Sequence, residues 1–118
     1  MSHSQRPPIT CHVLDTSLGR PAQGVPMELD KLEEGGWARR GTTLTNEDGR
    51  APGLFFPGDT ITAGTYRIRF DTASYFRKIG GKTFYPEVAV VFNIEDTSQH
   101  YHIPLLLSPF GYSTYRGS

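Results

Sequence analysis

The sequence has one cysteine, no excess of either charge and no long apolar run. Cys11 alone cannot form an internal disulfide, which favours a reducing compartment. Twelve basic residues balance twelve acidic ones, so nothing attracts nucleic acid or an anionic membrane, and we expect neither partner. No segment reaches the ~20 apolar residues of a membrane span, and the polar start lacks the apolar stretch of a signal peptide. We therefore expect a cytoplasmic protein.

Several enzyme motifs are also missing. The chain contains no Walker A loop, no dinucleotide-binding fingerprint, no Gly-x-Ser-x-Gly elbow and no cysteine pair. Cys11 and His12 are adjacent in a stretch of strand-like alternation, so their side chains should face opposite ways. A cysteine–histidine nucleophile pair is therefore not expected.

The 118 residues fit a single domain. Residues 1–8 are polar and contain two prolines, which predicts a flexible N-terminal tail, with the folded domain over residues 9–118. The apolar fraction is only 36%, but aromatic residues reach 12%. This balance indicates a thin core of large side chains, or a core completed by partner subunits.

Alternation of apolar and polar residues predicts short β-strands along most of the domain. Ile9, Cys11 and Val13 alternate with Thr10, His12 and Leu14, and this period of two is the pattern of a strand. Asp71 or Thr72 can cap a short helix that ends at Gly80-Gly81. Further strands are expected over residues 25–32, 37–44, 64–70, 86–94, 99–107 and 111–115, with a short one at 54–56. Turn-rich segments at 15–24, 45–49 and much of 51–64 favour an all-β antiparallel sandwich.

Three histidines and one arginine are candidates for chemistry. His100 and His102 flank Tyr101, so both side chains point to one side of their strand, whereas His3 lies in the predicted tail. With His12 as third ligand they could bind zinc, although no acidic or cysteine residue has a known ligand spacing nearby. Alternatively, a histidine takes a proton from water while Arg50, directly after a tight turn, stabilises the oxyanion. Ordinary surface positions explain these residues as well, so the residues alone leave the alternatives open.

The C-terminal segment is unusual because it is aromatic and strand-prone, whereas chain ends are commonly polar and frayed. If it docks onto the domain, Tyr115-Arg116-Gly117-Ser118 brings a hydroxyl, a guanidinium and a carboxylate to a site. An exposed tail is the alternative.

Four segments, taken in order, resemble the signatures of the 5-hydroxyisourate hydrolases of the transthyretin-related family. They are Ile9-Thr10-Cys11-His12-Val13-Leu14-Asp15 with Gly19-Arg20-Pro21-Ala22, then Thr45-Asn46-Glu47-Asp48-Gly49-Arg50, then His100 to Pro109, and finally Tyr112 to Ser118. The resemblance covers residues 9–118. It implies a transthyretin-like β-sandwich of about eight strands with one short helix, assembled as a homotetramer with sites at the dimer–dimer interface.

The resemblance also implies an activity. Members of this family hydrolyse 5-hydroxyisourate to 2-oxo-4-hydroxy-4-carboxy-5-ureidoimidazoline in urate degradation, without a cofactor or metal. Matched position by position, the catalytic residues are His12, Arg50 and His102, and the substrate-binding residues are Tyr115, Arg116, Gly117 and Ser118. His100 matches a position outside the core site. Transthyretin, a hormone carrier of the same fold, lacks these histidines, the arginine and the Tyr-Arg-Gly-Ser ending, so a small-ligand carrier is the alternative function.

Overall fold

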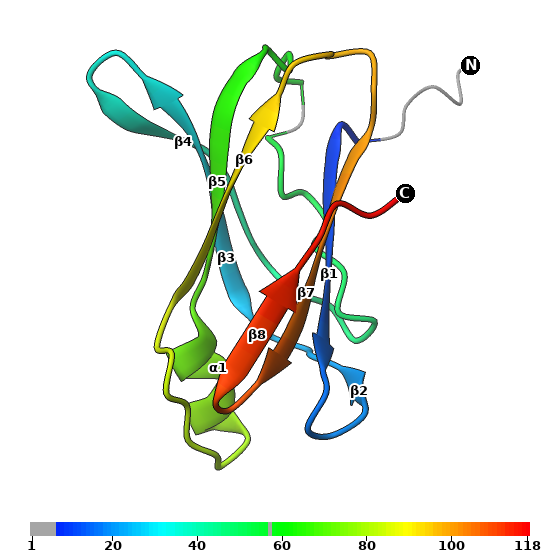
Figure 1. Ribbon diagram of the computed structural model, residues 1–118, viewed down its shortest axis with the longest axis vertical. Helices are drawn as coiled ribbons and strands as arrows, with labels where there is room; N and C mark the ends of the chain where they lie inside the picture. Colours follow the sequence, from blue (N-terminus) through cyan, green and yellow to red (C-terminus); the bar gives the residue numbers. More distant parts are fainter. Residues whose placement is uncertain (1–6, 57) are drawn as a thin grey trace.

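The computed structural model describes residues 7–56 and 58–118, which form two four-stranded sheets packed face to face (Figure 1). Their strand orders are β2-β1-β7-β8 and β4-β3-β5-β6. The elements are β1 (Ile9–Asp15), β2 (Arg20–Pro21), β3 (Pro26–Glu33), β4 (Gly36–Leu44), β5 (Gly64–Phe70), α1 (Thr72–Lys78), β6 (Val88–Ile94), β7 (Tyr101–Ser108) and β8 (Gly111–Thr114). Over the described residues, the prediction of an all-β sandwich with about eight strands and one short helix is confirmed.

One strand pair differs from the expected antiparallel arrangement. β1 runs parallel to β7, with Thr10 opposite His102 and Val13 opposite Leu105, and the two arrows point the same way in Figure 1. The other named pairs are antiparallel. A parallel pair needs a long crossover connection, which here passes through the whole second sheet. Residues 92 positions apart in the chain therefore become neighbours.

The core lies between the sheets, and β1 shows how the alternation builds it. Ile9, Cys11 and Val13 are fully buried, whereas the intervening Thr10 and His12 are half-buried on the outer face. Burial raises the pKa of the Cys11 thiol to about 12, so the thiol stays protonated and unreactive at neutral pH. The only helix in the described part of the chain has seven residues, too few to cross a membrane.

The helix forms where the cap residues predict it. The Asp71 carboxylate accepts a hydrogen bond of 3.0 Å from the Ser74 backbone N–H, as an N-cap residue does. Gly80, with φ +80°, follows the end of the helix in the left-handed region that glycine adopts without strain. Tyr75 on the buried side of the helix donates its hydroxyl to Asp15 at 2.6 Å, which ties the helix to the first sheet.

Asp15 also organises the segment over residues 15–24, which was predicted as turns only and in fact contains β2. The carboxylate is fully buried and accepts hydrogen bonds from the backbone N–H groups of Ser17 and Leu18. Burial alone raises the pKa of this carboxyl, but the hydrogen bonds from Ser17, Tyr75 and Leu18 outweigh it, so the pKa is lowered. Gly19 then turns the chain so that two residues pair back onto β1.

The short strand predicted at 54–56 is wrong. This segment has only an isolated contact to β4, in which the Phe56 N–H donates to the Arg40 carbonyl at 3.0 Å, and the prolines and glycines around it prevent a continuous ladder. The contact falls where the β3–β4 register shifts. There the Leu54 carbonyl lies directly against Gly41, and an added Cβ would meet its oxygen at 1.4 Å.

Part of the predicted N-terminal tail is anchored. The Pro8 carbonyl accepts a hydrogen bond of 2.9 Å from the Tyr101 N–H, and the Pro7 carbonyl lies 2.6 Å from Nδ1 of His100. The chain is therefore attached to β7 and its preceding loop two residues before the predicted domain start. Residues 1–6 of the predicted tail lie outside the described residues.

We expect Gly41→Ala to destabilise the protein, because the new Cβ would overlap the Leu54 carbonyl and displace the whole 51–56 segment. Overpacking of this kind costs about 3 kcal/mol at the upper end of its common range. Gly35→Ala is the control, since nothing lies within 4 Å of its Cβ position. Urea unfolding of both variants measures the difference, and equal midpoints would contradict this account of the close approach.

Candidate active site

The candidate residues meet on the outer face of the β1–β7 sheet. Thr10 and His12 point outward from β1, and His102 points outward from β7, opposite Thr10. Two isolated bridges extend these rows on either side. Arg50 pairs with His12 beside β1, and Gly117 pairs with His102 beside β7.

This arrangement brings the two histidines close together. One row across the sheet contains Arg50 and His12, and the next contains Thr10, His102 and Gly117. Strands lie about 4.8 Å apart and residues rise about 3.3 Å along a strand, so the Cα atoms of His12 and His102 are separated by roughly 8 Å. Side chains that share a face at this spacing can act on one small molecule.

His12 is held by the turn that precedes Arg50. Its Nε2 lies 2.7 Å from the Asp48 carbonyl oxygen, which can only accept, so Nε2 carries a proton. Gly49, with φ +75°, packs against the same edge of the ring, and a Cβ there would lie 3.3 Å from Cδ2 of His12 and 2.3 Å from the Val13 carbonyl oxygen. The turn can approach β1 this closely only because it has no side chain at residue 49.

Arg50 is positioned by its backbone and leaves its side chain exposed. The Asn46 side-chain oxygen accepts from the Arg50 N–H at 3.0 Å, and the Arg50 carbonyl accepts from the Asn46 N–H at 2.9 Å. Among the residues that the structure describes, no carboxylate forms an ion pair with the Arg50 guanidinium. A permanent positive charge without an internal counter-charge suits an anionic or strongly polar ligand.

Two groups contact the His102 ring, one on each side of its Cγ atom. Its Nδ1 lies 2.8 Å from the Thr10 hydroxyl oxygen. On the opposite side Gly117 packs against the ring, where a Cβ would lie only 2.6 Å from Cδ2. Because Nδ1 and Cδ2 are the two ring atoms bonded to Cγ, the tip of the ring, which carries Nε2, points away from the sheet.

His100 lies closer to the site than the family resemblance implies. Its Nε2 is 2.9 Å from the same Thr10 hydroxyl oxygen, and its ring stacks beside that of His102 at a centroid distance of 6.4 Å. Thr10 thus connects two histidines, a role that sequence reasoning missed.

No group of three or more histidine, cysteine, aspartate or glutamate side chains in the described ranges has the arrangement of a metal site.

The C-terminal segment docks beside the histidines. The Gly117 N–H donates to the His102 carbonyl at 2.8 Å. The Arg116 guanidinium lies 4.5 Å from the centroid of the Tyr101 ring and donates to the Gln99 side chain at 2.7 Å, so it fastens the segment. Tyr115 and Ser118 remain exposed on either side. Of the four predicted substrate-binding residues, Gly117 therefore contacts His102, and Arg116 binds Tyr101 and Gln99.

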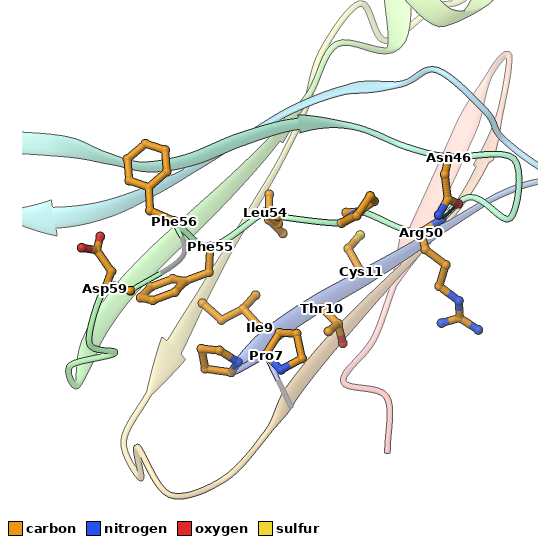
Figure 2. A pocket seen from close by; sticks show the side chains of 15 residues that line it. Pro7, Ile9, Thr10, Cys11, Asn46, Arg50, Leu54, Phe55, Phe56 and Asp59 are labelled. Carbon is orange, nitrogen blue, oxygen red and sulfur yellow. Dashed lines mark hydrogen bonds between the residues drawn. The ribbon is translucent and has the colours of Figure 1, made fainter. Parts of the chain in front are cut away.

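A groove near these residues runs along the edge of β1 that β7 does not cover (Figure 2). It has a volume of about 590 Å³ and lies between β1 and the segment that contains Leu54 and Phe55. In Figure 2 Ile9 and Cys11 point into it, and Arg50 is one of the residues that line it. The groove is mainly apolar, and neither His12 nor His102 lines it, whereas His102, Tyr115 and Arg116 line a smaller pocket of about 260 Å³.

Comparisons with known proteins agree with these observations. Residues 9–117 match the family model described as HIUase/Transthyretin family. A 5-hydroxyisourate hydrolase of Mus musculus is 50% identical over 113 residues, covering 94% of this chain and 95% of the relative. The structure of Klebsiella pneumoniae 5-hydroxyisourate hydrolase has a TM-score of 0.77 and 34% identity, covering 93% of this chain and 92% of that one. Sea bream transthyretin in complex with thyroxine has a TM-score of 0.87 and 32% identity, covering 94% and 95%. The chain is therefore a member of the HIUase/Transthyretin family.

Proposed function

We propose that this protein hydrolyses 5-hydroxyisourate to 2-oxo-4-hydroxy-4-carboxy-5-ureidoimidazoline, the step that follows urate oxidation in purine breakdown. The observation that supports the proposal is the backbone pairing that places His12, His102 and Arg50, from three separate chain segments, in neighbouring rows of one sheet. The family relatives named 5-hydroxyisourate hydrolase support the choice of substrate. We also propose a cytoplasmic location, because the free buried thiol of Cys11 is typical of a protein in a reducing compartment.

The reaction needs one water molecule and no cofactor. His102 acts as general base and takes a proton from water, whose oxygen bonds to a carbonyl carbon of the six-membered ring. Arg50 donates hydrogen bonds to the oxyanion that develops on that carbonyl. His12, whose Nε2–H is held by the Asp48 carbonyl, binds the substrate by accepting a hydrogen bond from a ring N–H at its Nδ1. The ring carbon–nitrogen bond then breaks, the nitrogen takes up the proton, and the ring opens to a carboxylate.

The site also explains why we propose a homotetramer with sites at the dimer–dimer interface. The histidine-bearing face is open to solvent in a single chain, whereas hydrolytic sites commonly exclude bulk water. Large aromatic side chains are exposed near the C-terminal segment: Phe110 at 74%, Tyr115 at 58% and Tyr112 at 43%. Exposed aromatic residues of this kind are typical of surfaces that other subunits cover.

A small-ligand carrier is the alternative, because the likeness to sea bream transthyretin extends over almost the whole chain. The test is a spectroscopic assay with 5-hydroxyisourate generated freshly from urate, run with and without a chelator. We expect catalysed decay of the substrate signal at the same rate in both conditions. Decay no faster than the uncatalysed rate would remove the hydrolase proposal, and loss of activity with chelator would contradict metal-free catalysis.

We expect His102→Ala and Arg50→Ala to lower turnover while the protein stays folded. Loss of a general base costs about 10²–10⁴ in rate, and loss of an oxyanion donor about 10²–10³ in kcat. Arg40→Ala is the control, because Arg40 is an arginine paired with Glu33 on the other sheet. Steady-state assays measure the effect, and a variant with near-normal turnover refutes the role given to its residue.

We expect Gly117→Ala to lower turnover as well, because the added Cβ must displace either the His102 ring or the C-terminal segment. A misplacement of a catalytic group by 1 Å costs up to about 10²-fold. Gly111→Ala at the start of β8 is the matched control, since its Cβ would lie at an ordinary distance of 3.8 Å from the Ser108 hydroxyl. Both variants are assayed for turnover and thermal stability. Equal activity in the two variants contradicts the close packing of Gly117 on the catalytic ring.

A further inference from the structure

We infer that Thr10 and His100 are positioning residues that hold neutral His102 with its proton on Nδ1 and its basic lone pair on Nε2. The inference rests on the proposed role of His102 as general base and adds which of its nitrogens takes the proton. It also assigns a positioning role to His100, which matches a position outside the core site in the family resemblance. The argument follows one chain of hydrogen bonds from the Pro7 carbonyl to His102.

The first link fixes the proton on His100. The Pro7 carbonyl oxygen lies 2.6 Å from Nδ1 of His100. A carbonyl oxygen has lone pairs and no hydrogen, so it can only accept. Nδ1 of His100 therefore carries a proton, and in the neutral ring Nε2 carries the lone pair.

The second link fixes the direction of the Thr10 hydroxyl. Nε2 of neutral His100 is an acceptor, and the Thr10 oxygen lies 2.9 Å from it, so the hydroxyl donates its single hydrogen to His100. The same oxygen lies 2.8 Å from Nδ1 of His102. With its hydrogen already used, Thr10 can only accept there. Nδ1 of His102 must therefore be the protonated nitrogen.

The result places the basic nitrogen where the reaction needs it. Thr10 and Gly117 lie beside Nδ1 and Cδ2 of the His102 ring, the two atoms bonded to Cγ. Nε2 therefore lies at the other end of the ring, which points away from the sheet. His12 is held in the opposite tautomer, because the Asp48 carbonyl requires the proton on Nε2 of His12. The two imidazoles of the site are thus distinguished by carbonyl groups at different places in the chain.

The arrangement is specific to a hydroxyl at residue 10. Thr10 and His102 are opposite each other in the β1–β7 register, and the His100 and His102 rings are nearly parallel, with 15° between their planes. One oxygen between two such rings can accept from one and donate to the other, whereas a valine of the same shape can do neither. A purely structural role for residue 10 would be met by valine, which suits a strand equally well.

The test is the tautomer of His102 in ¹⁵N-labelled protein without substrate, read from the two-bond correlations between its ring nitrogens and ring hydrogens. At a pH well above the ordinary histidine pKa of about 6.5, we expect protonated Nδ1 in the unmodified protein and in Thr10→Ser, and a shift towards protonated Nε2 in Thr10→Val. Thr65→Val is the control, because it removes one exposed hydroxyl hydrogen bond on the other sheet. Protonated Nε2 on His102 of the unmodified protein overturns the inference, whatever the enzyme's activity.

Turnover provides the second measurement. We expect Thr10→Val to lower kcat about ten- to a hundredfold, the range seen when the partner that orients a functional histidine is lost, with little change in KM. Thr10→Ser restores kcat, His100→Phe lowers it, and Thr65→Val leaves it unchanged. A fall in kcat for Thr10→Val with an unaltered His102 tautomer overturns the inference while leaving the hydrolase proposal intact. Absence of turnover in the unmodified protein contradicts the proposed function and leaves the tautomer result standing.

Discussion

The parallel contact between β1 and β7 is the constraint on which the site depends. It joins two segments 92 positions apart and places Thr10 opposite His102. Side chains alternate along a strand, so a slip of one residue would move every outer residue into the core. The buried apolar residues of both strands, such as Cys11 and Ile103, prevent that slip. The packing of the core therefore fixes which polar groups meet outside it.

Two glycines then allow other parts of the chain to reach the histidines. Gly49 lets the turn before Arg50 approach the His12 ring, and Gly117 lets the C-terminal segment lie against the ring of His102. A backbone hydrogen bond accompanies each approach. The Asp48 carbonyl bonds the ring of His12, and the Gly117 N–H donates to the His102 carbonyl. Each imidazole thus lies against backbone that approaches closely because the residue there is glycine, and this packing restricts the movement of the ring.

Local patterns predicted the strands and the helix well, because their causes are local. The alternation over residues 64–70 coincides with β5, and Asp71 caps the helix as its side chain allows. The parallel pairing could not be predicted, since nothing in either strand specifies a partner so far along the chain. The role of Thr10 was missed for the same reason, because a threonine on the polar side of a strand is ordinary until its neighbours are known. The strand predicted at 54–56 does not form. Leu54 is buried, as a strand residue would be, but it lies in a loop that packs against the core.

The backbone alone does not distinguish a hydrolase from a transthyretin that binds thyroxine. The TM-score is higher with sea bream transthyretin, at 0.87, than with the Klebsiella pneumoniae hydrolase, at 0.77. One sheet framework therefore accommodates both kinds of protein, and function depends on the side chains placed upon it. A carrier surface needs only shape and apolar contact, whereas a hydrolytic site needs a nitrogen that is unprotonated and correctly aimed. With the proton positions inferred above, the chain of hydrogen bonds from Pro7 through His100 and Thr10 to His102 meets that stricter requirement, and each member of the chain must be oriented for it to do so.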